Sequence, residues 1–224
     1  MRINQFVAAA SGLSRRGADA AVAAGRVTIE NQPAQTGQLV TDAQQVQLDG
    51  QPLALPTAHT YLVLNKPTGY VTSRVQQGTH PTIYELLPPE YRSLRPVGRL
   101  DQESCGLLLL TDDGAFIHRH THPSFDKAKT YQLTLDQPLT LGHQRQLESG
   151  VRLKDGLSRL TVIKVNGRDV VVGLSEGRNR QIRRTFGALG YRVDRLERIQ
   201  MGSYTLGNLA EGAWRLADLT PEDV

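Results

Sequence analysis

Residues 61–174 contain five segments with the composition of β-strands, and helix-like segments do not alternate regularly with them. The strand-like segments are YLVLNK (61–66), LLLLT (107–111), TYQLTL (130–135), LTVIKV (160–165) and DVVVGL (169–174). Beyond residue 61, helical stretches are predicted near 113–120, 140–149 and 180–190. Because a doubly wound parallel sheet needs a helix between successive strands, this order predicts an α+β fold with a mixed sheet.

The N-terminal residues predict a smaller unit of two helices and two strands. Apolar residues recur at helical spacing over 3–10, and Ser14 can cap a second helix. The segments RVTIE (26–30) and QVQLDGQPL (45–53) predict short strands with turns between them. The segment ALPTAHT (54–60) then has the composition of a linker, so we expect two domains.

The cysteine count and the lengths of the apolar segments indicate the cellular compartment in which the protein is expected. A single cysteine, Cys105, excludes an intrachain disulfide. No apolar stretch follows Arg2 as in a secretory signal, and the longest strongly apolar run, residues 107–110, is too short to span a bilayer. We therefore expect a soluble, cytoplasmic protein that does not bind membranes. The net charge of +4 and a pI of about 9.4 are by themselves weak pointers to nucleic acid.

The positive charge is concentrated late in the chain. Residues 1–55 hold four arginines and four acidic residues, whereas 178–198 hold seven arginines and two acidic residues. A predicted helix there has an apolar and a roughly opposite basic face, formed by Ile182, Phe186 and Leu189 and by Arg180, Arg183 and Arg184. Arginines without local acidic partners favour phosphates or a buried carboxylate as counter-charge. A solvated surface helix is the alternative.

Asp101 stands just ahead of the most apolar segment, in GRLDQESCGLLLLTDDG (98–114). A charged residue rarely introduces a buried strand without a specific role. From the residues alone, Asp101 could pin Arg99 or another arginine in an ion pair. It could also form a carboxylate pair with Glu103, as in glycosidases.

Two further patterns, one around a tyrosine and one of three histidines, concern candidate binding or metal sites. Tyr131 alternates with leucines along its strand, so it faces a core or a cleft, and a packed tyrosine is the alternative to a functional one. His118, His120 and His122 are spaced at i, i+2 and i+4, which cannot place all three on one helix face. The sequence therefore predicts no zinc site. It also lacks a P-loop and a GxGxxG motif.

Five segments, in this order along the chain, resemble the RsuA/RluB/RluF branch of the pseudouridine synthases. They are SRRGADAAVAAGRVTIENQPA (14–34), LNKPTGYVTS (64–73), GRLDQESCGLLLLTDDG (98–114), KTYQLTL (129–135) and EGRNRQIRRTFGALGYRVDRLERIQMG (176–202). The resemblance implies an S4-like RNA-binding domain at 1–55, a linker at 56–60 and a catalytic domain with a mixed, mostly antiparallel sheet at 61–224. GTHPTIYELL (78–87) and the overall layout resemble the RsuA type, which modifies small-subunit rRNA.

The resemblance assigns roles to particular residues. Asp101 would attack C1′ of a flipped-out uridine or remove its C2′ proton, two options that the sequence leaves open. Arg183 would pair with Asp101 and keep it ionised. Tyr131 would stack on the uracil and assist proton removal at C5, Leu196 would supply an apolar wall, and Arg99 would hold the flipped conformation. Contacts to RNA are implied for Lys66, Arg178, Asn179, Arg180 and Arg184, and in the S4-like domain for Arg15, Arg16 and Arg26.

The implied activity is the isomerisation of uridine to pseudouridine in ribosomal RNA, with the small subunit favoured over the large. The uracil leaves and returns within one site, so neither cofactor nor metal is expected. The enzyme is expected to be a monomer. Its expected partner is rRNA or a ribosome-assembly particle. Two other classes stay open: an RNA-binding or assembly protein that has kept the fold without catalysis, and a carboxylate-pair hydrolase of nucleosides or glycosides.

Overall fold

The computed structural model describes residues 1–41, 43–125 and 127–219. The chain divides into two compact units, residues 1–59 with 112–114 and residues 60–111 with 115–224. Within the described ranges, no helix is long and apolar enough to cross a membrane.

The smaller unit packs two helices on a four-stranded antiparallel sheet of order β2-β1-β3-β4. Its elements are α1 (Ile3–Ser11), α2 (Arg15–Ala23), β1 (Val27–Ile29), β2 (Gln32–Pro33), β3 (Val46–Leu48) and β4 (Gln51–Leu53). Gly12 ends α1 in a left-handed conformation with φ of 76°, and the Ser14 side chain accepts a hydrogen bond from Gly17 N at the start of α2. Both predicted helices are confirmed, and the sheet has two more strands than the sequence indicated.

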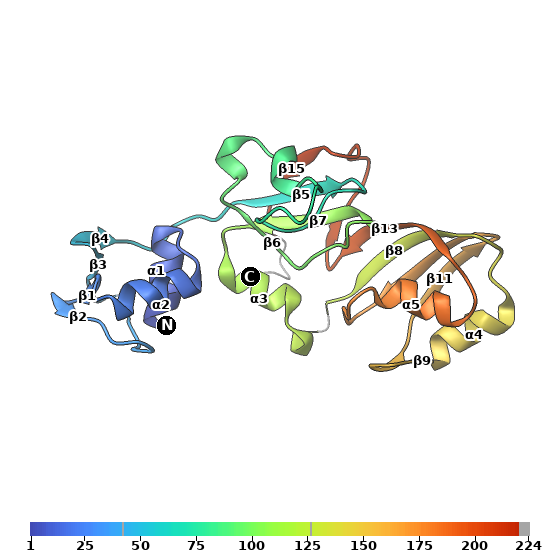
Figure 1. Ribbon diagram of the computed structural model, residues 1–224, viewed down its shortest axis with the longest axis horizontal. Coiled ribbons are helices and arrows are strands. Elements are labelled where there is room, and N and C mark those ends of the chain that lie inside the picture. The colour runs from blue at the N-terminus through green and yellow to red at the C-terminus, as the bar shows by residue number, and fades with distance from the viewer. Residues whose placement is uncertain (42, 126, 220–224) are drawn as a thin grey trace. The chain divides into compact units, whose positions relative to one another are not determined.

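The larger unit is built on a nine-stranded sheet (Figure 1). Seven strands follow the order β11-β12-β8-β13-β7-β5-β15, with β14 paired to β13 and β6 paired to β7. Their bounds are β5 (Tyr61–Lys66), β6 (Arg95–Pro96), β7 (Cys105–Thr111), β8 (Lys129–Leu135), β11 (Thr161–Asn166), β12 (Asp169–Leu174), β13 (Val193–Met201), β14 (Tyr204–Thr205) and β15 (Trp214–Leu216). Among the described strands of this sheet, only β13 and β7 pair in parallel. The predicted α+β fold with a mixed, mostly antiparallel sheet is confirmed.

Helices cover both faces of this sheet, which explains the continuous apolar runs. The helices are α3 (Gly114–Thr121), α4 (Leu141–Ser149) and α5 (Gln181–Ala188), and a small hairpin is formed by β9 (Val151–Leu153) and β10 (Gly156–Ser158). On β7, Leu108 and Leu110 join the core that contains residues of α4 and α5, whereas Leu107 and Leu109 join the core around Phe116 of α3. The four leucines are consecutive because each face of the strand needs apolar residues.

The central strand β13 was not predicted from the sequence. Its pairing with β8 shifts register twice, between Val193 and Arg195 and between Arg198 and Gln200. Such bulges break the two-residue alternation by which a strand is identified. Gly106 lets β7 approach β13: its φ is +100°, and a Cβ there would lie 2.3 Å from the Arg198 carbonyl oxygen. The parallel contact between the two halves of the sheet therefore depends on glycine at this position.

Candidate active site

A cavity of ≈ 310 Å³ in the larger unit is lined by segments that lie far apart in the sequence. They are the loop ahead of β7, the strands β8 and β13, the end of β12, and the loop that leads into α5 together with the start of that helix. The cavity brings together most of the predicted site residues, namely Arg99, Asp101, Tyr131, Arg178, Asn179, Arg180 and Leu196. Six predicted residues are not part of this lining: Lys66, Arg183 and Arg184 of the larger unit, and Arg15, Arg16 and Arg26 of the smaller unit.

Asp101 lies in a short loop that is fixed through its backbone. The Thr72 hydroxyl donates to the Leu100 carbonyl at 2.9 Å, and Gly69 N donates to the Gln102 carbonyl at 2.9 Å. Ser104 N donates to the Asp101 carbonyl at 3.0 Å and closes a turn. Within the described chain, no group donates a hydrogen bond to the Asp101 carboxylate. Backbone hydrogen bonds thus hold the loop in place, and the Asp101 carboxylate is available to a group bound in the cavity.

Lys66 holds this loop and cannot contact RNA, which corrects the sequence-based assignment. Its side chain is fully buried, and its ammonium donates to the carbonyls of Ser104 and Pro67 at 2.8 and 2.9 Å. Longer contacts of 3.3 and 3.5 Å reach the carbonyls of Asp101 and Gln102. Burial lowers the pKa of Lys66 from 10.5 to about 8. The sequence pattern could not distinguish a phosphate-binding lysine from one that satisfies backbone carbonyls.

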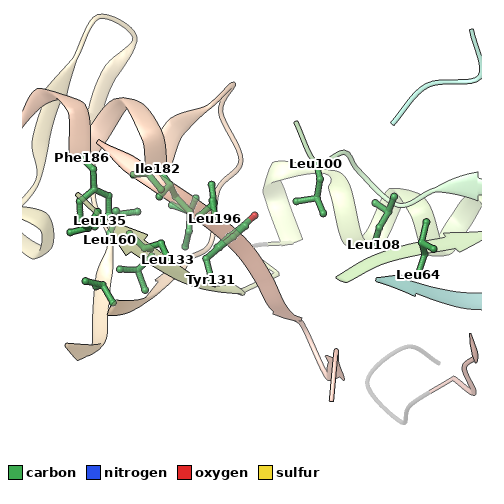
Figure 2. Close-up of a cluster of buried hydrophobic side chains, with 14 of the residues drawn as sticks. Leu64, Leu100, Leu108, Tyr131, Leu133, Leu135, Leu160, Ile182, Phe186 and Leu196 are labelled. Carbon is green, nitrogen blue, oxygen red and sulfur yellow. The ribbon is translucent and has the colours of Figure 1, made fainter. Parts of the chain in front are cut away.

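Tyr131 and Leu196 form an apolar wall of the cavity. Tyr131 lies on the same side of β8 as Leu133 and Leu135, and its side chain is 8% exposed. Figure 2 shows its ring beside Leu196, with the hydroxyl oxygen directed away from Leu133. The alternation along β8 therefore predicted the direction of Tyr131 correctly. A flat base can lie against such a wall of ring and aliphatic carbon.

Arg183 does not form the predicted ion pair with Asp101. Its guanidinium donates to the carbonyls of Val193 at 2.7 Å and of Glu103 at 2.9 Å, and its Nε lies 3.8 Å from the Glu103 carboxylate. Arg180 pairs with the same carboxylate at 2.8 Å, and this hydrogen bond lowers the pKa of Glu103. Glu103, which sits two residues after Asp101, thus takes the arginine that was assigned to Asp101. It is not available for a glycosidase-like carboxylate pair.

The arginines around α5 have carboxylate partners, one of the two kinds of counter-charge that the sequence led us to expect. Arg184 binds both carboxylate oxygens of Asp155 at 2.8 Å, which lowers the pKa of Asp155. Arg178 donates to the carbonyls of Asp155 and Leu157 and pairs with Glu176 at 3.0 Å. Asp155 is far away in the sequence, in the turn between β9 and β10, so a local count of charges missed it.

The other predicted RNA-binding arginines differ in whether their side chains already have a hydrogen-bond or ion-pair partner. Arg99 is exposed, lines the cavity, and has no hydrogen bond or ion pair among the described residues. Arg15 and Arg16 are exposed in the first turn of α2 in the smaller unit. Arg26 is engaged by Asp49, with Nε donating to Oδ1 at 2.8 Å. Arg99, Arg15 and Arg16 are therefore the predicted cations that are open to a phosphate.

The three histidines of the 118–122 segment do not form a metal site. His120 is buried and stacks on Phe116 with ring centroids 3.9 Å apart, whereas His118 and His122 lie together, 4.9 Å apart. In the described part of the chain, no group of three His, Cys, Asp or Glu side chains is placed to hold a metal ion.

Comparisons with known proteins agree on one family. Residues 60–188 match the family described as RNA pseudouridylate synthase. The chain is 38% identical over 232 aligned positions to "Ribosomal small subunit pseudouridine synthase A" of Yersinia pestis, covering 100% of this chain and 97% of that protein. The protein of the same name from Escherichia coli (strain K12) is 37% identical over 236 positions, covering 100% and 98%.

A solved structure, "Crystal structure of pseudouridylate synthase", is similar over almost the whole chain. It has a TM-score of 0.70 and 31% sequence identity, and the match covers 97% of this chain and 96% of that one.

Proposed function

Because the chain belongs to the RNA pseudouridylate synthase family, we propose that it isomerises a specific uridine of small-subunit ribosomal RNA to pseudouridine. The observation that carries the proposal is the cavity, which gathers Asp101, Tyr131 and Leu196 in a protein with this family's fold. The names of the Yersinia and Escherichia relatives support the small subunit as the source of the substrate.

The reaction requires little beyond a carboxylate and a shaped cavity. The C1′–N1 bond breaks, the freed uracil turns, and a C1′–C5 bond forms while the C5 proton is lost and N1 is left protonated. Asp101 acts on the ribose, either by attack at C1′ or by removal of the C2′ proton. The uracil lies against Tyr131 and Leu196, which keep it from leaving and exclude water. The target uridine has to leave its stack, because the carboxylate lies inside a cavity.

Lys66 and Arg183 act as positioning residues on two sides of the catalytic loop. Lys66 donates to the carbonyls of Asp101 and Ser104, and Arg183 donates to the carbonyl of Glu103. Neither group touches the Asp101 carboxylate. Arg183 supports Asp101 through the loop, which replaces the direct ion pair expected from the resemblance.

Arg99 holds the flipped-out conformation of the target uridine, and Arg178, Asn179 and Arg180 line the same cavity. Residues 1–55 form an S4-like RNA-binding domain in which Arg15 and Arg16 at the start of α2 bind phosphate. Arg26 adds to this only if RNA displaces Asp49. The protein works as a cytoplasmic monomer on rRNA or on an assembly particle.

Pseudouridine mapping tests the proposal. Ribosomal RNA from a strain that lacks the gene should have lost one pseudouridine of the small subunit, and the wild-type gene should restore it. A gene encoding Asp101→Asn should not. Restoration by Asp101→Asn would favour the alternative of a non-catalytic RNA-binding protein, and an unchanged map would reject the substrate.

A further inference from the structure

A second cavity of ≈ 290 Å³ adjoins the candidate active site. It lies between the end of α3, the loop ahead of β8 and the strand β13. The two cavities share lining residues, among them Gly98, Arg99, Tyr131 and Arg178. When the target uridine of an RNA strand occupies the first cavity, the nucleotide next to it can therefore reach the second cavity.

The second cavity contains a buried cation without a counter-charge. Arg198 on β13 is 2% exposed, and its Nε donates to the Leu107 carbonyl at 2.7 Å. One terminal nitrogen, Nη2, is buried without a hydrogen-bond partner, and Arg198 has no ion pair within the described chain. A buried guanidinium with an unused donor and no carboxylate is costly for the fold. An anion bound in the cavity would offset this cost.

The lining around Arg198 is basic. Two lysines line the cavity: Lys127 lies in the loop ahead of β8, and Lys129 is the first residue of β8. The Lys129 ammonium donates to the carbonyls of Lys127 and Ser175, at 3.0 and 3.3 Å, and adds a positive charge to the lining. Glu176 is the acidic residue among those that line the cavity, and Arg178 and Gln181 already bind its carboxylate. The net charge of the lining therefore favours an anion.

We infer that this cavity is a subsite for one phosphodiester group of the RNA strand, next to the target uridine. The inference rests on the proposed function, because that function supplies a polyanion whose nucleotide enters the adjoining cavity. Arg198 and Lys127 bind the phosphate oxygens. Holding the backbone beside the flipped nucleotide fixes where its ribose lies relative to Asp101.

The test is a cycle of protein and RNA changes. The RNA is a synthetic fragment that spans the mapped uridine, with one phosphate at a time replaced by an uncharged methylphosphonate. Wild type is compared with Lys127→Gln, which alters a loop residue. Lys164→Gln is the matched control, because Lys164 is an exposed lysine on β11 outside both cavities. Arg198→Met is a second variant, used if its thermal unfolding stays cooperative.

At one position beside the target uridine, neutralising the phosphate should lower kcat/KM about tenfold for wild type and for Lys164→Gln, as expected for one charge-assisted hydrogen bond. For Lys127→Gln, and for Arg198→Met, the same replacement should cost less than about twofold. Equal penalties in all proteins at every position would overturn the subsite. Inhibition by inorganic phosphate combined with equal penalties would mean that the cavity holds a free anion, which also overturns it. If wild type makes no pseudouridine in unmodified RNA, the proposed function itself fails.

Discussion

Replacing Lys66 with methionine isolates the role of the buried ammonium, since methionine keeps an unbranched side chain and removes every donor. The carbonyls of Pro67 and Ser104 then lose hydrogen bonds of 2.9 and 2.8 Å. A buried acceptor left without its donor costs about 1–3 kcal/mol, so two cost about 2–6 kcal/mol. Relief from burying a charge offsets part of this cost. A pKa lowered from 10.5 to about 8 corresponds to roughly 3 kcal/mol at about 1.36 kcal/mol per unit.

The cost of burying the Lys66 charge depends on pH, and this dependence sets the direction in which the stability difference changes. The folded protein releases the Lys66 proton near pH 8, whereas the unfolded chain keeps it until about pH 10.5. The unfolded state therefore binds more protons in this window, so wild-type stability rises with pH from about 8 to 10.5 and falls again as the pH drops through 8. Lys66→Met lacks this titration. The difference in unfolding free energy between the two proteins should grow by about 2–3 kcal/mol between pH 7 and pH 10.

Urea unfolding of both proteins at the two pH values measures this difference, and subtraction removes the titrations that they share. Lys164→Met, at an exposed lysine, is the control and should show no such change. Single-turnover rates at pH 7 should fall more than RNA affinity does, because the loop that carries Asp101 loses its support. An unfolding difference that is the same at pH 7 and pH 10 would refute the reasoning, since Lys66 would then titrate as an exposed lysine does.

Other changes give distinct outcomes. Gly106→Ala should destabilise the protein by about 3 kcal/mol or more in urea unfolding, because the new Cβ meets the Arg198 backbone; wild-type stability would contradict the close approach. Arg99→Ala should flatten the salt dependence of RNA binding by about one unit of log–log slope. Arg184→Ala should flatten it much less, because a carboxylate already neutralises that arginine; equal slopes would contradict this distinction. Deleting residues 1–56 should leave a folded protein with modestly weaker binding to large RNA, and aggregation of the remainder would contradict the predicted domain boundary.

The fold was predictable where burial imposed a simple pattern. The alternation of Tyr131, Leu133 and Leu135 predicted the orientation of β8, and the four leucines of β7 indicated a buried strand. The strand β13 was missed although it lies at the centre of the sheet. Its two bulges and its charged residues, such as Arg198, disrupt the periodicity on which prediction depends.

The candidate site was predictable as a set of residues but not as a set of contacts. The sequence indicated Asp101 and Tyr131 as site residues, and in the structure both line one cavity. It could not show that Glu103 would take Arg183, or that Asp155 would take Arg184, because these partners are 80 and 29 residues away. Ion pairs depend on the folded neighbourhood, so charge counted along the chain overestimates the free cations.

The single-turnover rate of Asp101→Asn tests the central claim most directly. The variant keeps the size of the side chain and loses its charge, and the backbone bonds that fix the loop stay in place. With a cognate fragment of small-subunit rRNA, pseudouridine formation should fall by several orders of magnitude, since the nucleophile or base is lost. RNA affinity should stay within about tenfold, because few phosphate contacts change. Substantial pseudouridine formation by Asp101→Asn would contradict the assignment of this carboxylate as the catalytic group.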